Sequence, residues 1–293
     1  MLRYKSMFGE DASFIATQAD CFKKAEDKLP TFFKNDCYYT AKSLEQCTSE
    51  AVAAYKQTII KGKTLLEICG GLGVDSWALS KNFEQIISVD TDEELNAIVI
   101  NNYQKLGIKN IQRLSTPAES YISSPKTLNK FTAVYADPDR RPSSKRTGSL
   151  KDSLPDITAM LPDLLSLAET VFIKASPMYD ISMGFRELGT VRKVYVLGYK
   201  NEVKELLFEV GQEQTAEPEI HTVNIYGDGH CDEMVFGKRK EGPPIKDEGD
   251  YFFEPDSCII KSGRYGQYAV SFGLNSVDRN IPFFTGNTLP EHF

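Results

Sequence analysis

The first 60 residues carry apolar positions at helical spacing. Between residues 12 and 28 these positions recur every three or four residues, and Pro30 predicts the end of that helix. A second helix is predicted from Ser43 to about residue 61, because Ser43 is a good N-cap and Gln46 completes a capping-box pattern. We therefore expect an N-terminal helical region over residues 1–58.

From residue 63 the pattern changes to short apolar runs that alternate with amphipathic segments. Six runs predict strands, at residues 64–69, 85–90, 111–114, 132–136, 170–174 and 193–199. Helical spacing predicts helices at residues 74–82, 93–106, 157–167 and 179–188. Apolar strands joined by helical crossovers are typical of a parallel sheet covered on both faces. Residues 221–226 and 233–237 predict two later strands, which we interpret as an edge hairpin.

A charged stretch with Gly242 and two prolines, at residues 240–249, predicts a linker. Beyond it, residues 251–284 predict a small separate module, although so short a segment rarely folds alone. The expected organisation is a helical region at residues 1–58, a Rossmann-like α/β domain at 59–240 and a small α+β module at 250–293. Residues 289–293 show no clear terminal element, which we interpret as a further domain missing beyond them.

Composition indicates an ordinary globular protein. Of 293 residues, 41% are hydrophobic and 26% are charged. No apolar run approaches the roughly 20 residues that a membrane helix needs, and the N-terminus lacks the apolar segment of a signal peptide. We therefore expect a cytoplasmic protein without a membrane segment.

The placement of the cysteines and the net charge argue against two kinds of binding site. The six cysteines are scattered without a Cys-x-x-Cys pair, and only three histidines exist, so no metal site is expected and the thiols are interpreted as reduced. A net charge of -7 argues against tight non-specific binding to nucleic acid, but it leaves a local basic patch facing RNA open.

The strongest chemical signal is the glycine loop, Glu-Ile-Cys-Gly-Gly-Leu-Gly-Val-Asp from Glu67 to Asp75, between a predicted strand and a predicted helix. Gly71 and Gly73 let a ligand approach the backbone, and the helix N-terminus offers free N–H groups. A dinucleotide fingerprint needs glycine where Ser76 stands, and no P-loop lysine follows. Glu67 would repel a phosphate but suits a cation. We therefore predict S-adenosylmethionine, held by Glu67, Gly71 and Gly73, with a ligand-free turn as the alternative.

Two acids further along are candidates to hold the rest of this cofactor. Asp90 ends the second strand about 20 residues after the loop, where a carboxylate can accept both ribose hydroxyls. Asp92 is the second candidate for that role, and a helix cap or solvated carboxylate is the alternative for Asp90. Glu119 follows the third strand, where it can accept from the adenine amine. A first-turn helix acid, favoured by the macrodipole, is the competing interpretation of Glu119.

The fourth strand is followed by Asp137-Pro138-Asp139-Arg140-Arg141, at the edge where ligands bind in doubly wound sheets. Asp137 and Pro138 match the start of the Asp/Asn-Pro-Pro-aromatic motif of amino-group methyltransferases, in which the side chain and a backbone carbonyl accept from the target nitrogen. Asp139 and Arg140 depart from that motif. Asp137, Pro138 and Arg140 are the candidate catalytic residues, and an Asp-Pro turn before an exposed loop is the alternative. The basic cluster at residues 140–146 can contact RNA phosphates or lie solvated.

In these segments the chain resembles class I S-adenosylmethionine-dependent methyltransferases. More closely it resembles a bacterial family with ferredoxin-like and THUMP-like C-terminal domains, through residues 43–50, the glycine loop, residues 137–141, 173–178, 201–207 and 254–256. The resemblance implies a Rossmann-like sheet, a ferredoxin-like module at residues 250–293 and a THUMP-like module missing here. Because THUMP domains accompany tRNA modification, it also implies an RNA substrate. Finally, it implies that Gln46 and Ser49 border the cofactor pocket, with helix-surface roles as the alternative.

Three functions are therefore open. The leading hypothesis is methyl transfer to RNA, at a tRNA base. A small-molecule or protein methyltransferase is the second, which the acidic charge favours modestly. A non-catalytic RNA- or protein-binding module that keeps the cofactor fold is the third. Ser/His/Asp hydrolysis is not expected, because the three histidines follow residue 220, away from the predicted ligand crevice, and no nucleophile elbow precedes them.

Overall fold

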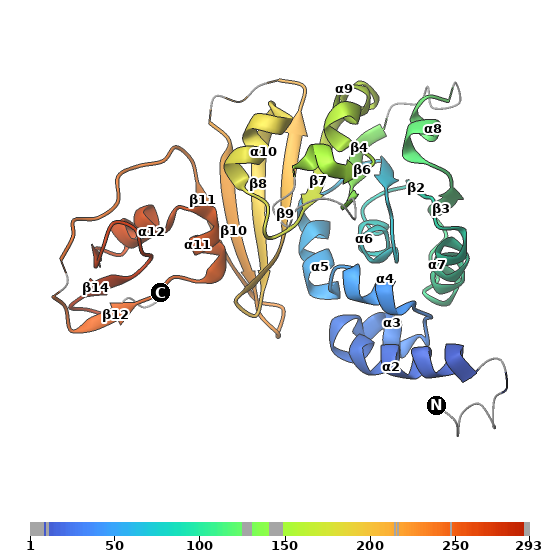
Figure 1. Cartoon of the computed structure of the whole chain (residues 1–293), viewed down its shortest axis with the longest axis horizontal. Coiled ribbons are helices and arrows are strands. Elements are labelled where there is room, and N and C mark those ends of the chain that lie inside the picture. Colours follow the sequence, from blue (N-terminus) through green and yellow to red (C-terminus); the bar gives the residue numbers. More distant parts are fainter. Residues whose placement is uncertain are drawn as a thin grey trace. The chain divides into compact units, whose positions relative to one another are not determined.

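A computed structural model describes residues 9, 12–124, 131–140, 149–213, 215, 217–246 and 248–289. The chain divides into two compact units (Figure 1). The first comprises Met1–Arg141 and Ser153–Val171, and the second comprises Pro142–Asp152 and Phe172–Phe293. No helix in the described part of the chain is long and apolar enough to cross a membrane. The cytoplasmic location stays a prediction.

The described part of the first unit begins with four helices: α2 (Ala12–Lys28), α3 (Pro30–Lys34), α4 (Ala41–Gln46) and α5 (Glu50–Ile59). The first predicted helix ends at Lys28, and Pro30 opens α3, since its fixed φ suits a first helical turn. The single helix predicted from Ser43 is wrong. The capping box is formed by Thr40 and Ser43, at the start of α4. The helical conformation is interrupted after Gln46, and Ser49 caps a separate helix, α5. The Ser49 side chain accepts a hydrogen bond from the first turn of α5, so a new helix can begin inside the segment predicted as one helix.

Four parallel strands follow: β1 (Thr64–Ile68), β2 (Gln85–Asp90), β3 (Ile111–Ser115) and β4 (Phe131–Ala136). They lie in the order β4-β1-β2-β3, so successive strands extend the sheet to one side of β1 before β4 returns to the other side. The helices between and after them are α6 (Val74–Leu79), α7 (Glu93–Lys105), α8 (Ala118–Ile122) and α9 (Ile157–Leu167). This order confirms the predicted parallel α/β sheet and places its topological switch between β1 and β4.

One apolar core joins the N-terminal helices to the helices that follow β1 and β2. Five buried members show this: Leu29, which caps α3, Phe32 of α3, Val74 and Ala78 of α6, and Val99 of α7. Because α6 starts directly at the glycine loop, this packing holds the loop against the end of the sheet.

The second unit contains η3 (Leu150–Asp152), α10 (Ile181–Leu188), β8 (Val191–Tyr199), β9 (Glu202–Gly211), β10 (Glu219–Ile225) and β11 (Cys231–Phe236). β7 (Ala168–Ala175) carries the chain from the first unit into the second. The strands lie in the order β11-β10-β8-β9, and antiparallel β10 and β11 confirm the predicted hairpin. β9 was not predicted. Lys200 and Asn201 both have left-handed φ and turn the chain straight back along β8.

The same unit ends in two helices and a small antiparallel sheet. The elements are β12 (Tyr251–Phe253), α11 (Ser257–Ser262), α12 (Tyr265–Ser271), β13 (Asn275–Ser276) and β14 (Phe284–Gly286), with sheet order β12-β14-β13. α11 lies against β10, where the Cys258 thiol donates to the Val223 carbonyl at 3.4 Å. The predicted division into domains at residues 1–58, 59–240 and 250–293 stays a prediction, because two compact units need not be segments that fold independently.

Candidate functional site

The glycine loop between β1 and α6 is shaped by left-handed backbone. Cys69, Gly71 and Gly73 have φ of 60°, 49° and 76°. An ideal Cβ at Gly73 would lie 2.2 Å from Tyr103 Oη, so packing as well as φ requires glycine there. At Gly71, by contrast, no heavy atom outside this residue and its two chain neighbours lies within 4 Å of the Cβ position. The loop is therefore packed on protein at Gly73 and open at Gly71.

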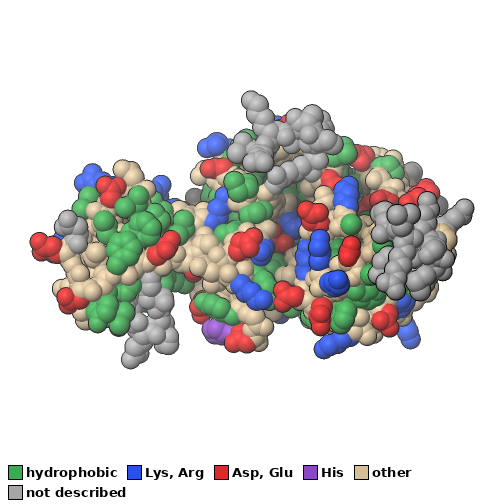
Figure 2. Space-filling model, turned by 60° about the horizontal axis from the view of Figure 1, so that its bottom comes forward, with side chains coloured by type: hydrophobic (Ala, Val, Ile, Leu, Met, Phe, Trp, Pro, Cys, Tyr) green, Lys and Arg blue, Asp and Glu red, His purple; other side chains and the backbone are tan. Residues whose placement is uncertain are grey.

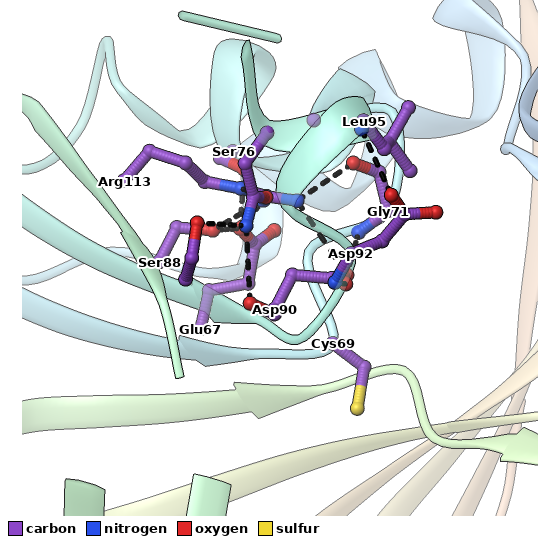
Figure 3. Close-up of polar contacts among 12 residues, drawn as sticks. Glu67, Cys69, Gly71, Ser76, Ser88, Asp90, Asp92, Leu95 and Arg113 are labelled. Carbon is purple, nitrogen blue, oxygen red and sulfur yellow. Dashed lines mark hydrogen bonds and ion pairs between the residues drawn. The ribbon is translucent and has the colours of Figure 1, made fainter. Parts of the chain in front are cut away.

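A buried charge network lies beneath this loop (Figure 3). Glu67, on β1, is 1% exposed, and its Oε2 accepts from Ser88 Oγ and, at 2.5 Å, from Ser76 Oγ. Arg113, on β3, lies 3.8 Å from the same oxygen and donates to the Gly71 carbonyl at 2.8 Å. The Glu67 carboxylate is thus enclosed by protein partners. This arrangement does not support direct contact with a cofactor, and we propose instead that Glu67 holds the loop from beneath.

Burial raises the pKa of Glu67 to about 7 from an ordinary 4.5, against the opposing charge of Arg113. A carboxyl with a raised pKa binds its proton more tightly in the folded state. Its contribution to the free energy of unfolding is therefore fully present below pH 4.5 and falls as the pH rises to about 7. Glu67→Gln cannot ionise, so the unmodified protein should lose roughly 1–3 kcal/mol relative to this variant over that range.

Urea denaturation of both proteins at matched pH values between 4.5 and 8 measures this difference. Glu119→Gln, which removes one exposed carboxyl group from the same unit, controls for the change in net charge. Parallel pH profiles for the unmodified protein and Glu67→Gln would contradict the raised pKa.

Asp90 ends β2 beside the open part of the loop. Its Oδ2 accepts the Gly71 N–H at 2.9 Å and lies 3.5 Å from Arg113 Nη2, while Oδ1 accepts the Asp92 N–H at 3.1 Å. The side chain is 14% exposed. Asp92 instead caps α7, because its Oδ1 accepts the Leu95 N–H at 2.9 Å. The geometry therefore favours Asp90 over Asp92 for the proposed ribose contact.

Asp90→Ala is expected to weaken binding of S-adenosylmethionine by about 10- to 100-fold, since hydrogen bonds to charged groups contribute about 1.5–3 kcal/mol. Asp92→Ala removes only a helix cap, so it should cost about 1 kcal/mol of stability with little change in affinity. Isothermal titration calorimetry compares the two. Equal losses of affinity in both variants would refute the ribose role of Asp90.

Four carboxylates gather around Cys69 at the same end of the sheet. Burial first, and then the charges of Asp90, Asp137, Asp139 and Glu119, raise the pKa of the Cys69 thiol. These acids follow β2, β3 and β4, whose carboxyl ends meet at one edge. Their summed field favours a cationic ligand there.

Asp137 lies at the switch point of the sheet. Its N–H donates to the Ile68 carbonyl at 3.1 Å, next to the start of the glycine loop. Asp137 and Pro138 are half-buried, and the chain continues into β5 (Asp139–Arg140), which pairs with β6 (Ser153–Leu154). The Arg140 side chain and residues 141–148, which hold most of the basic cluster, lie outside the described part of the structure.

The remaining sequence-predicted residues lie on short helices. Gln46 is exposed at the end of α4, and Ser49 accepts the Val52 N–H at 3.4 Å as the cap of α5. Glu119 is exposed in the first turn of α8. Their contacts with a cofactor stay predictions.

Sequence reasoning missed the buried cations of this unit. Arg113 has a fully buried side chain, and so does Lys56, whose Nζ lies 2.6 Å from Asp75 Oδ1 and donates to Tyr135 Oη at 3.1 Å. Tyr135 in turn donates to Asp75 Oδ2 at 2.9 Å. A lysine or arginine within an apolar strand or helix face is the signal that could have revealed them, because buried charge needs a partner. No group of three or more metal-ligating side chains occurs among the described residues.

Comparison with known proteins places this geometry in context. A family model described as "Conserved hypothetical protein 95" matches residues 45–155, which span the glycine loop, Asp90, Glu119 and Asp137. Proteins of two Mycobacterium tuberculosis strains, each called an uncharacterized S-adenosylmethionine-dependent methyltransferase, are 20% identical over 98% of this chain and 77% of their own length. A crystal structure of a provisionally assigned methyltransferase from Porphyromonas gingivalis W83 is 25% identical, with a TM-score of 0.85 over 97% of this chain and 73% of its own.

The fold is thus shared along nearly the whole chain with the Porphyromonas gingivalis protein, and this likeness confirms a Rossmann-like sheet with N-terminal helices and a small C-terminal antiparallel sheet. The glycine loop and the acidic edge of the sheet suit a cationic methyl donor. The chain is an S-adenosylmethionine-dependent methyltransferase.

Proposed function

We propose that this enzyme transfers the methyl group of S-adenosylmethionine to a nitrogen of an RNA base, with tRNA as the substrate. The main support for this proposal is the position of Asp137 directly after β4, at the carboxyl edge of the sheet. Its backbone is anchored to Ile68 at the switch point, at the same edge as Asp90 and the open side of Gly71. An acid in an Asp-Pro sequence there can accept a hydrogen bond from a target amine and orient its lone pair.

The chain's own residues fit the cofactor. Gly71 leaves open space on one side, Asp90 offers a partly exposed carboxylate, and further acids around Cys69 favour a cation. When bound, S-adenosylmethionine supplies an already activated methyl group, so the protein needs no covalent intermediate. Asp90 then binds the ribose, Asp137 orients the acceptor, and the backbone at Gly71 and Gly73 lets the cofactor approach closely.

RNA is favoured as the acceptor by the sequence that follows Asp137. Five arginines and lysines follow Asp137 in the sequence by residue 151, four of them within residues 140–146, and such side chains suit RNA phosphates. Figure 2 shows Lys and Arg side chains interspersed with Asp and Glu on the face drawn, without one broad basic surface. We therefore assign phosphate contacts to this cluster, and we propose that residues 250–293 form the ferredoxin-like module of the family that the sequence resembles.

Methyl transfer from tritiated cofactor to separate tRNA, rRNA, protein and metabolite fractions tests the acceptor. We expect label in tRNA, located by nuclease digestion and mass spectrometry of the nucleosides. If metabolites or protein carry the label and tRNA does not, RNA is not the acceptor and the enzyme is a small-molecule or protein methyltransferase. Cofactor binding without transfer to the RNA fractions would likewise contradict RNA as the acceptor.

A further inference from the structure

Arg113 carries a buried positive charge that the proposed reaction does not use directly. Its side chain is fully buried on β3, and each nitrogen of the guanidinium has its own acceptor. Nε donates to Asn96 Oδ1 at 2.6 Å, Nη1 to Ser88 Oγ at 2.7 Å, and Nη2 to the Gly71 carbonyl at 2.8 Å. Two carboxylates, those of Glu67 and Asp90, lie 3.8 and 3.5 Å away. A buried charge this fully paired fixes the groups around it.

The contacts of Arg113 close a ring with the two groups proposed to receive the cofactor. Arg113 holds the carbonyl of Gly71, the N–H of Gly71 donates to Asp90 Oδ2 at 2.9 Å, and that same oxygen faces Arg113 Nη2. Both polar groups of the Gly71 residue are therefore satisfied from within the protein. This leaves Gly71 held in its left-handed conformation, with its open side unobstructed.

The ring also restricts the Asp90 carboxylate. Oδ2 is taken by Gly71 and Arg113, and Oδ1 accepts from the Asp92 N–H, so rotation of the carboxylate would break several contacts at once. A ligand that binds a group already held in place loses less conformational entropy than one that must order it.

We propose that Arg113 is a positioning residue that presets Gly71 and Asp90 for S-adenosylmethionine without touching the cofactor. This inference rests on the proposed cofactor site, but not on RNA as the acceptor. Arginine is required because its planar fork reaches three acceptors in fixed directions, whereas the single ammonium of lysine cannot hold Gly71, Ser88 and Asn96 together.

The test compares Arg113→Lys with Lys56→Met. Lys56 is a second fully buried cation in the described part of this unit, and it contacts Asp75 and Tyr135. Both variants should lower the melting temperature, because each disturbs a buried ion pair. Only Arg113→Lys should weaken S-adenosylmethionine binding by roughly tenfold in calorimetry, since supporting contacts set the geometry of the binding groups.

A second measurement separates positioning from general stability. Hydrogen exchange of the cofactor-free protein should be faster in Arg113→Lys at the backbone N–H of Gly71, and unchanged there in Lys56→Met. If Arg113→Lys does not fold, Asn96→Ala, which removes the acceptor of Nε, should give a smaller loss of affinity in the same direction. Wild-type affinity in the Arg113 or Asn96 variant, or an equal loss in Lys56→Met, would overturn the inference. Failure of the unmodified protein to bind the cofactor would overturn the proposed site itself.

Discussion

Replacing Asp137 by alanine is expected to lower kcat by about 10²–10⁴-fold, while the dissociation constant of S-adenosylmethionine stays within about threefold. The acid sits where the proposed target amine must be oriented, and groups that orient or exchange protons with a reacting atom contribute on this scale. Asp137 is anchored through its backbone N–H to Ile68, so truncating the side chain leaves that anchor intact.

Asp139→Ala is the matched control for this variant. Asp139 is another acid of the same loop, near Cys69, but it is exposed and follows Pro138 in β5. Removing its charge should therefore change kcat by only a few-fold. Steady-state methyl transfer to the labelled fraction, together with calorimetry, measures both quantities. Parallel losses of turnover and cofactor affinity in Asp137→Ala would count against its catalytic role.

Gly70→Ala is expected to lose stability, whereas Gly71→Ala is expected to fold but to lose affinity for S-adenosylmethionine. At Gly70 an ideal Cβ would lie 1.9 Å from Arg113 Nη1, 2.4 Å from Ser88 Oγ and 2.6 Å from Glu67 Oε2. These atoms belong to the buried network and cannot move without breaking its hydrogen bonds. Gly70→Ala should therefore cost on the order of 3–5 kcal/mol, a large part of the stability of an ordinary domain.

Gly71→Ala meets no atom within 4 Å, so only its left-handed φ is unfavourable, at about 1–2 kcal/mol. This variant should fold, but its methyl group would project into the open space where we place the cofactor. We expect at least tenfold weaker binding of S-adenosylmethionine.

Thermal denaturation and calorimetry on both variants separate these effects. The melting temperature should fall steeply for Gly70→Ala and modestly for Gly71→Ala, with affinity lost in the latter despite a native fold. A folded Gly71→Ala that binds the cofactor as tightly as the unmodified protein would place the binding site elsewhere.

Local patterns predicted much of the first unit. The apolar runs that predicted β1 to β4 agree with the strands within about one residue at each end, because strands buried in a parallel sheet need continuous apolar side chains. Where the local pattern was ambiguous, prediction failed. Residues 202–211 gave no clear strand signal, and pairing with β8 after the turn at Lys200 and Asn201 decided their conformation. The break between α4 and α5 was likewise decided by a second cap, Ser49, inside a segment with helical spacing.

The sequence by itself determined the order of strands and helices and which polar residue follows each strand, including Gly71, Asp90 and Asp137. These features depend on neighbours along the chain. Only the tertiary structure decided that Glu67 faces inward, and that Arg113 holds it together with Asp90. Buried charges are stable only beside a partner, and the partner is set by which strands become neighbours. β2 pairs with both β1 and β3, and this arrangement brings an acid from the first strand and an arginine from the third to the same glycine loop.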